Sequence, residues 1–318
     1  MMSDGRNAIG VPLVLSPSFD AKTWGGRRLE QYGKTLPPGP IGEALESGPD
    51  ARVAGGPFDG LTLGELSRNH SAALLGQRGL VASGALQDFP LLIKLIDAHE
   101  DLSVQVHPDD ASAPAGKRGK TEAWYILDAE PDARIVTGVE GAIDIDRIAE
   151  RLTETVVQPG EVYFVPAGTV HAIGAGVLLY EIQQASDVTW RLYDWGRPRE
   201  IHVEQALAVA REESRVSRVE PRTLDSGRDL LVACEYFALE RWKVSGVMPL
   251  RAMPESFRVV TVLDGGVTVG DTHLMRGVTA VLPADLDATQ LDGSGVLLIG
   301  YIPDGDVSKA FIQTGAPD

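Results

Sequence analysis

Four side chains near the middle of the chain have the types and spacing of a metal site. Gln105 and His107 are separated by one residue, Glu122 follows, and His171 ends the run Gly160-Glu-Val-Tyr-Phe-Val-Pro-Ala-Gly-Thr-Val-His171. Residues i and i+2 of a strand point to the same face, so Gln105 and His107 would point together. Imidazole, carboxylate and amide oxygen atoms suit a borderline divalent ion. We expect one metal ion per chain, Zn²⁺ or another divalent metal.

This set of donors also indicates what the ion would do. With a single carboxylate among the ligands, a divalent ion keeps a net positive charge, which can stabilise a developing oxyanion. A closed structural zinc site more often uses cysteines, and the only cysteine of the chain is Cys234. Taken one at a time, each residue could also be an ordinary hydrogen-bonded side chain on a strand. The case rests on the combination.

The elements that would hold these residues are strands. Residues 160–171 indicate a strand, a tight turn and a second strand that begins near His171. Strand parity places Lys120 beside Glu122. Residues 89–96 indicate a buried strand that contains Lys94, and a lysine there is either at a sheet edge or functional, because burying an unpaired charge is costly.

Three helices are also expected. Thr62 and Glu65 have the spacing of a capping box, which predicts a helix that continues through Ala73. Residues 142–152 and 203–211 also indicate helices.

The pattern changes after about residue 215, where short strands alternate with turns. Examples are residues 257–263, 266–269 and 278–283. The segment Gly277-Val-Thr-Ala-Val-Leu-Pro-Ala-Asp285 repeats the glycine-to-proline spacing of residues 160–168, with Asp285 in place of the second glycine and no histidine after it. It is either a degenerate copy of the first motif or a chance similarity between short strands.

Composition sets further limits. The chain has 318 residues, 43% of them hydrophobic, which is enough for one large or two ordinary domains. A single cysteine excludes an intramolecular disulfide and fits a reducing cytoplasm. We find neither a signal-peptide pattern nor an apolar run of the ~20 residues that a membrane span needs.

The net charge of −16, without a basic tract, argues against nucleic-acid and anionic-membrane partners. An anionic substrate would need local cations, for which Lys94, Lys120 and Arg191 are the candidates.

In their order along the chain, these motifs resemble the type I mannose-6-phosphate isomerases (phosphomannose isomerases) in their short bacterial form, within the cupin superfamily. Residues 160–171 look like the second cupin motif, and Gln105, His107 and Glu122 look like the first, with glutamine in the first histidine position. One departure is Ala44-Leu45-Glu46, where the family usually has a tryptophan before the glutamate. The matching segments are residues 24–29, 40–43, 90–96, 102–110, 119–124, 160–171 and 184–195.

The resemblance implies a mainly β fold of two cupin-like jelly-roll barrels, with a few helices inserted in the N-terminal half. Residues 1–215 would form the catalytic metal-binding domain, and residues 216–318 a degenerate cupin-like β domain. The implied reaction interconverts mannose 6-phosphate and fructose 6-phosphate through a cis-enediol. The implied partner is thus a small sugar phosphate, and the chain would be a monomer or a homodimer.

The resemblance also implies roles for individual residues. Arg191 would act in catalysis or on the substrate's charge, although it could instead form a salt bridge with an aspartate such as Asp187. Lys94 and Lys120 would bind substrate oxygens or phosphate, with Lys120 also counted as catalytic. Glu181 and Asp187 are the candidates for the catalytic base.

Two other functions remain open. One is a catalytically inactive metal-binding paralogue that binds a sugar or sugar phosphate. The other is an iron-dependent cupin oxygenase, which would typically use two histidines and a carboxylate. Gln105 and the Lys120-Thr-Glu122 pair argue against the oxygenase.

Overall fold

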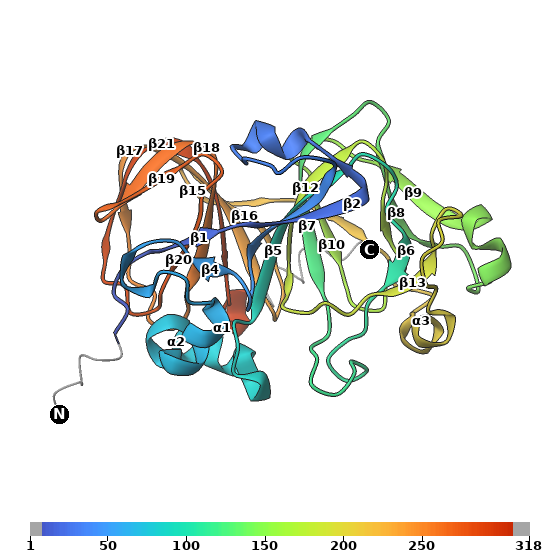
Figure 1. Cartoon of the computed structure of the whole chain (residues 1–318), viewed down its shortest axis with the longest axis horizontal. Coiled ribbons are helices and arrows are strands. Elements are labelled where there is room, and N and C mark those ends of the chain that lie inside the picture. Colours follow the sequence, from blue (N-terminus) through green and yellow to red (C-terminus); the bar gives the residue numbers. More distant parts are fainter. Residues whose placement is uncertain (1–7, 308–318) are drawn as a thin grey trace.

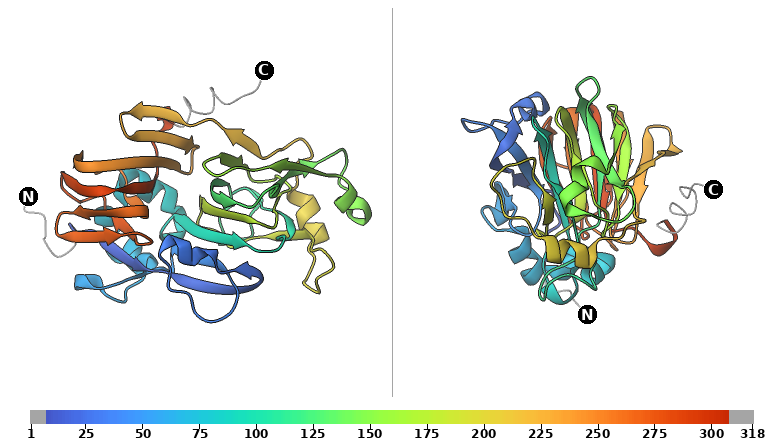
Figure 2. Two further views of the ribbon diagram at one scale, coloured as in Figure 1. Left: turned by 90° about the horizontal axis from the view of Figure 1, so that it is seen from above. Right: turned by 90° about the vertical axis from the view of Figure 1, so that its right-hand side faces the viewer.

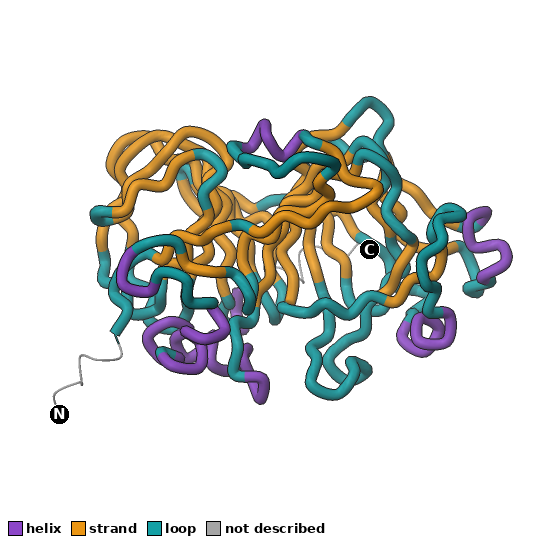
Figure 3. The backbone as a smooth tube through the Cα atoms, viewed as in Figure 1, coloured by secondary structure: helices purple, strands orange, loops and turns teal. Residues whose placement is uncertain are grey.

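The computed structural model describes residues 8–307, and β-strands dominate it (Figure 1). Strands from the end of the chain form one group, at the left of Figure 1, and strands from its middle form another, at the right. The helices lie around the edges of these strands (Figure 3). The predicted mainly β fold is confirmed. Residues 1–7, where the sequence lacks a signal-peptide pattern, lie outside the described residues.

The first group is a nine-stranded sheet, counted over residues 8–307, and all its pairings are antiparallel. Its strands follow the order β15-β16-β17-β21-β18-β20-β1-β4, and β19 pairs with β18. In chain order they are β1 (Leu13–Ser16), β4 (Arg52–Val53), β15 (Arg222–Asp225), β16 (Arg228–Ala233), β17 (Ala238–Leu250), β18 (Arg258–Val269), β19 (Thr272–Met275), β20 (Thr279–Leu282) and β21 (Thr289–Tyr301).

The second group contains a seven-stranded sheet in the order β14-β10-β7-β12-β5-β2-β3, a three-stranded sheet in the order β11-β8-β9, and the pair β13-β6. The strands are β2 (Ser18–Gly26), β3 (Ile41–Ser47), β5 (Leu91–Ala98), β6 (Val104–Val106), β7 (Glu122–Ala129), β8 (Arg134–Val139), β9 (Leu152–Val156), β10 (Val162–Val165), β11 (Ala172–Ile173), β12 (Val177–Gln184), β13 (Trp190–Tyr193) and β14 (Ser217–Val219).

The helices are short. They are α1 (Leu63–Asn69), α2 (Ser71–Ser83) and α3 (Val203–Val209), with 3-10 helices η1 (Arg28–Tyr32), η2 (Gly56–Phe58), η3 (Gly84–Leu86) and η4 (Ile145–Glu150). No helix within residues 8–307 is long and apolar enough to cross a membrane.

The two faces of the seven-stranded sheet differ: one packs in the hydrophobic core, and the other carries the candidate site. On β5 and β12, Ile93, Leu95, Tyr180 and Ile182 belong to the large core that includes the nine-stranded sheet. A Cβ atom added to Gly300 of β21 would lie 2.8 Å from Ile182 Cδ1, so the two sheets pack closely. Since strand residues alternate between faces, the residues between these apolar ones point away from the nine-stranded sheet, toward the small sheets of the second group. The candidate site lies on that second face.

The two proposed domains, residues 1–215 and 216–318, exchange strands. From the N-terminal part, β1 and β4 join the nine-stranded sheet, and β1 pairs directly with β20. In the other direction, β14 pairs with β10 of the seven-stranded sheet. Figure 2 shows the two groups of strands side by side along the long axis of the molecule. Segments from each side of the proposed boundary therefore join the other group of strands, and the division into two domains stays a prediction.

Several element boundaries differ from the sequence prediction. The helix expected to run from Thr62 through Ala73 is two helices, because the backbone at His70 leaves helical geometry between α1 and α2. The capping box of Thr62 and Glu65 is present. The helix expected at 142–152 is only η4, since the chain there must turn into β9, which pairs with β8.

Downstream, the helix expected at residues 203–211 is present as α3, which ends at Val209. The strands expected at 257–263 and 266–269 are one strand, β18, with an irregularity in its register between Val262 and Asp264.

Candidate metal centre and active-site pocket

Pairing between strands aligns the candidate residues in rows. In the seven-stranded sheet, Glu122 pairs with Gln183, and Glu181 pairs with both Trp124 and Lys94. Directly paired residues point to the same face, as do residues two apart. Glu122, Glu181 and Lys94 are therefore presented together on the face opposite the shared core.

A second row faces them from the small sheets. Gln105 of β6 pairs with Arg191 of β13, and an isolated bridge joins Gln105 to His171. The bridge consists of two backbone hydrogen bonds of 3.0 Å. The turn before His171 is tied to the same strand, because the N–H of Gly168 donates to the carbonyl of His107 at 2.8 Å. Gly168 has φ of +86°, a conformation that side chains disfavour, so glycine is required there.

These rows bring the predicted ligands together. One donor atom each from His107, Glu122 and His171 lies within 4.8 Å of the others, and all three residues are buried. His107 Nε2 lies 3.6 Å from Glu122 Oε2, and His171 Nε2 lies 3.4 Å from Glu122 Oε1. The side-chain nitrogen of Gln105 lies 3.4 Å from His171 Nε2. Since amide oxygen and nitrogen exchange by a simple flip, Gln105 can offer its oxygen at this place.

Both histidines are oriented as metal ligands usually are. The Nδ1 atom of His107 is 2.9 Å from the carbonyl of Val188, and that of His171 is 2.9 Å from the carbonyl of Thr169. A carbonyl only accepts, so each Nδ1 carries the proton and each Nε2 is an acceptor, which at His107 lies 3.1 Å from the ammonium group of Lys120. Burial and the nearby Lys120 hold the pKa of His107 well below its usual value, and burial lowers the pKa of His171 to about 4. Both rings are neutral at physiological pH.

Glu122 provides the test of whether a cation fits. It is fully buried, and among the described residues neither of its oxygens has a hydrogen-bond partner of acceptable geometry. The contact that it does have is an ion pair with Lys120, whose Nζ lies 2.6 Å from Oε2. A buried carboxylate normally has its oxygens fully hydrogen-bonded. Two carboxylate oxygens without a hydrogen bond of acceptable geometry, beside two imidazole Nε2 atoms, are what a divalent cation would complete.

A pocket of about 290 Å³ opens beside this centre and is lined by Gln105, Lys120, Lys94, Glu181 and Arg191, among others. Lys94 forms an ion pair with Glu43 at 3.0 Å. Burial alone would lower the pKa of Lys94, but the carboxylates of Glu43 and Glu181 outweigh it and raise the pKa. Lys94 is therefore a fixed positive charge in the wall of the pocket.

Glu181 is the buried carboxylate of this pocket. Its Oε2 accepts a hydrogen bond from the indole of Trp124 at 3.1 Å, while Oε1 has no partner among the described residues. Burial, together with the charge of Glu122, raises the pKa of Glu181. A carboxyl group with a raised pKa and a free oxygen is suited to giving and taking protons.

Arg191 lines the same pocket. The sequence left open that it forms a salt bridge with a nearby aspartate instead of meeting the substrate. Its Nη1 donates to the carbonyl of Glu200 at 2.7 Å, and its Nε is buried without a partner among the described residues. No salt bridge joins it to Asp187 or Asp194 within those residues. Asp194 instead pairs with Arg197 and Arg199.

Asp187 has a different environment from Glu181. Its side chain is 73% exposed and forms an ion pair with Lys117 at 2.8 Å. The hydrogen bond from Lys117 lowers its pKa. Asp187 lies at the pocket wall as an ionised, solvated carboxylate.

Sequence reasoning missed other residues of the pocket, notably Glu43 and Trp24. They come from β3 and β2, which approach so closely that a Cβ atom on Gly25 would lie 2.3 Å from the nitrogen of Gly42. Both glycines stand next to these two residues in motifs already singled out. The Trp24-Gly25 and Gly42-Glu43 pairs were therefore the sequence features that could have predicted these two pocket residues.

Comparison with known proteins agrees with this geometry. The family model of the phosphomannose isomerase type I catalytic domain matches residues 13–138, a span that contains Gln105, His107 and Glu122. The mannose-6-phosphate isomerase ManA of Bacillus subtilis is 34% identical, over 92% of this chain and 99% of its own. The mannose-6-phosphate isomerase of Streptococcus mutans is also 34% identical, over 89% of this chain and 95% of its own.

The chain belongs to the type I phosphomannose isomerase family. The crystal structure of the mannose 6-phosphate isomerase from Bacillus subtilis superposes with a TM-score of 0.79 at 32% identity, covering 91% of this chain and 99% of that one. A mutant phosphomannose isomerase from Salmonella typhimurium, at 16% identity, shares the fold with a TM-score of 0.74 over 92% of this chain and 100% of its own. The cupin architecture expected from the sequence is thereby supported over most of the chain.

Proposed function

We propose that this protein is a metal-dependent aldose–ketose isomerase that interconverts mannose 6-phosphate and fructose 6-phosphate. The observation that carries the proposal is the buried group of His107, Glu122 and His171 at the wall of a polar pocket, in a chain of this family. The single buried Cys234 is in keeping with a reducing compartment such as the cytoplasm.

We propose zinc as the ion, held by Gln105, His107, Glu122 and His171. Two neutral imidazoles, one carboxylate and one amide oxygen are donors that zinc accepts. When bound, the ion would supply Lewis-acid polarisation of the sugar's oxygens. Glu122 would then bind both the ion and Lys120. This contact would keep the ammonium group of Lys120 close to the bound sugar.

The remaining chemistry falls to side chains of the pocket. Isomerisation moves a proton between C1 and C2, so one group must take the proton and return it. Glu181 suits this task better than Asp187, because its pKa is raised and one of its oxygens is free. The lowered pKa and the ion pair of Asp187 make it a poor proton carrier.

The cations of the pocket would bind the anionic parts of the substrate. Lys94, Lys120 and Arg191 line it from three different strands or loops. The planar fork of Arg191 can meet a phosphate or an oxyanion with two parallel hydrogen bonds. In a chain whose net charge is −16, this local group is what would favour a sugar phosphate.

A coupled assay tests the proposal directly. Fructose 6-phosphate formed from mannose 6-phosphate is measured in the untreated enzyme, after dialysis against a chelator, and after Zn²⁺ is added back. We expect activity, loss of activity and recovery, respectively. The absence of turnover in the zinc-loaded protein would leave the inactive, sugar-binding paralogue as the better description.

A matched pair of variants tests the choice of base. Glu181→Gln and Asp187→Asn both replace a carboxylate by an amide of the same size. We expect Glu181→Gln to lower kcat by at least ~10²-fold, as loss of a general base does, and Asp187→Asn to change it only a few-fold. The reverse result would move the base to Asp187.

A further inference from the structure

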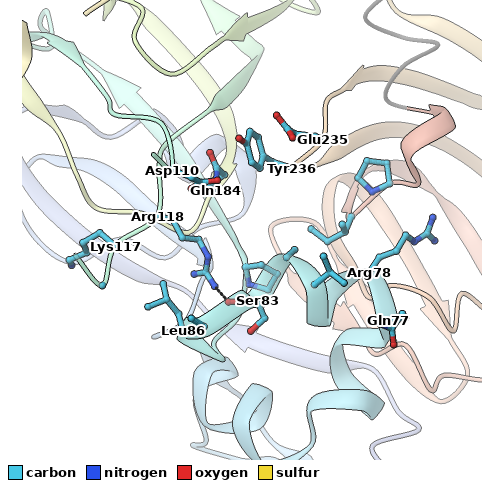
Figure 4. A pocket seen from close by; sticks show the side chains of 18 residues that line it. Gln77, Arg78, Ser83, Leu86, Asp110, Lys117, Arg118, Gln184, Glu235 and Tyr236 are labelled. Carbon is cyan, nitrogen blue, oxygen red and sulfur yellow. Dashed lines mark hydrogen bonds between the residues drawn. The ribbon is translucent and has the colours of Figure 1, made fainter. Parts of the chain in front are cut away.

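A large cavity lies away from the metal centre. It measures about 640 Å³ and lies between the end of α2 with η3, the loop at residues 116–118, and residues 235–236 and 302–303 (Figure 4). None of its lining residues lines the active-site pocket. Cavities of this size are typical of small-molecule sites. The proposed reaction therefore does not involve this cavity.

Arg118 is the residue that points to a ligand. Its Nη2 donates to the carbonyl of Ser83 at 2.8 Å, as Figure 4 shows, and pairs with Asp88. The residue exposes only 9% of its surface, and its Nη1 is buried without a hydrogen-bond partner among the described residues. Leaving a buried donor unsatisfied is costly, so an acceptor supplied by a ligand would be favoured.

The other charges around the cavity leave Arg118 available. Asp110 is occupied by the N–H of Gly119 at 2.7 Å and by the side chain of Gln184 at 3.1 Å. Burial, together with the charges of Asp110 and Glu235, raises the pKa of Tyr236, so its phenol stays protonated and can donate.

The remaining lining combines further donors with apolar walls. Arg78 and Lys117 also line the cavity, in ion pairs with Asp304 and Asp187 respectively, and the Nε of Arg78 is likewise buried without a partner among the described residues. Ala82, Leu86 and Ile302 provide apolar walls. The cavity thus combines charged and neutral hydrogen-bond donors with apolar walls.

We propose that this cavity binds a small organic anion through a phosphate or carboxylate group placed against Arg118. The ion pair with Asp88 and the bond to Ser83 hold the guanidinium in place, so that little side-chain freedom is lost on binding. The apolar part of the ligand would lie against Ala82 and Leu86. This site does not depend on the proposed isomerase activity.

Calorimetric titration of the zinc-loaded full chain tests the proposal, with inorganic phosphate and acetate as separate probes. In Arg118→Gln we expect the affinity of the probe for this site to fall at least ~10-fold, because the charged donor is lost. Ala85→Trp fills the cavity while keeping Arg118, and should have the same effect even if Arg118→Gln folds poorly. Arg147→Gln removes an exposed arginine that pairs with Glu150 and should bind like the wild type.

The two probes separate the possible ligands. Phosphate that binds without acetate identifies a phosphorylated ligand, and the reverse identifies a carboxylate. Phosphate held in the active-site pocket is recognised because Arg191→Ala weakens it, whereas Ala85→Trp does not. The proposal is overturned if neither probe binds the wild type, or if Arg118→Gln and Ala85→Trp bind both probes with wild-type affinity and stoichiometry.

Discussion

Two buried glutamates, one in each barrel, differ in how completely the protein satisfies them. Glu240 of β17 accepts hydrogen bonds from the phenol of Tyr301 at 2.7 Å, the indole of Trp242 at 2.7 Å and the guanidinium of Arg228 at 2.9 Å. Glu122 of β7 has an ion pair with Lys120 and no hydrogen bond of acceptable geometry within residues 8–307. The protein itself satisfies the carboxylate of Glu240 with three hydrogen-bond donors. The carboxylate of Glu122 has no such donor and lies beside the two histidines.

The two related turn motifs show the same contrast. The first ends in His171, which faces Glu122. The second contains Asp285, whose carboxylate accepts the backbone N–H groups of Ile9 and Gly10 at 2.7 and 2.9 Å. In the second motif the carboxylate of Asp285 instead anchors a neighbouring segment, and no histidine follows it. Similar strands can therefore serve chemistry in one region and stability in the other.

The largest effect is expected for His171→Ala. This variant should lose its bound metal and its isomerase activity, while the far-ultraviolet circular dichroism spectrum stays that of the wild type. A β core of this size does not depend on one ion for folding, unlike a small zinc module. Metal analysis after dialysis against a chelator, with the coupled assay beside it, provides the measurement. Wild-type activity in the metal-free variant would contradict the metal centre.

Arg191→Ala should have the next largest effect and should leave metal content unchanged. We expect kcat/KM to fall by at least ~10²-fold, in line with the loss of a donor to the transition state. Arg191→Lys should recover little, because a point charge cannot reproduce the planar fork. Steady-state kinetics and metal analysis on the same preparations check this. Near-normal turnover in the alanine variant would reduce Arg191 to a structural residue.

Glu240→Gln addresses the second barrel. The variant loses the carboxylate charge to which Arg228 and two neutral donors are hydrogen-bonded. We expect the free energy of unfolding to fall by about 2 kcal/mol, with metal content and kcat unchanged. Urea denaturation measures the change. Asp225→Asn is the control, because Asp225 forms an exposed ion pair with the same Arg228 and should cost less than ~0.5 kcal/mol. If Glu240→Gln instead lost metal or activity, the contrast between the barrels would be wrong.

The smallest effect is expected for Asp285→Ala. Its carboxylate accepts two backbone N–H groups at the edge of the fold, so its removal should cost about 1 kcal/mol. Activity and metal content should not change. Thermal unfolding, followed beside the activity assay, provides the comparison with His171→Ala.

Strand parity explains why much of the site could be anticipated from the sequence. Gln105 with His107, and Lys120 with Glu122, are pairs two residues apart whose directions were predicted from strand alternation, although β6 ends at Val106 and β7 begins at Glu122, so that His107 and Lys120 lie just outside their strands. The structure places Lys120 Nζ 2.6 Å from Glu122 and Gln105 beside His171. Local patterns of this kind require no knowledge of how distant strands pair.

Long-range partners could not be anticipated in this way. Glu43 meets Lys94 because β3 pairs with β5, and nothing near Lys94 in the sequence signals that pairing. Likewise, residues 142–152 carry a helix-like pattern, but pairing of β9 with β8 limits the helix to η4. Arg191 had two aspartates nearby in sequence, yet it donates to the carbonyl of Glu200. In each case the tertiary contact outweighed the local preference.

The pairing of β1 with β20 also constrains the order of folding during synthesis. Leu13 lies opposite Val281, so the edge of β1 that pairs with β20 must wait for nearly the whole chain, whereas its other partner, β4, is made early. Closing so long a loop is slow, and an unpaired strand is open to wrong partners in the meantime. The shortness of β1, only four residues, limits that exposure. The nine-stranded sheet is thus assembled from both ends of the chain, and its completion marks the end of folding.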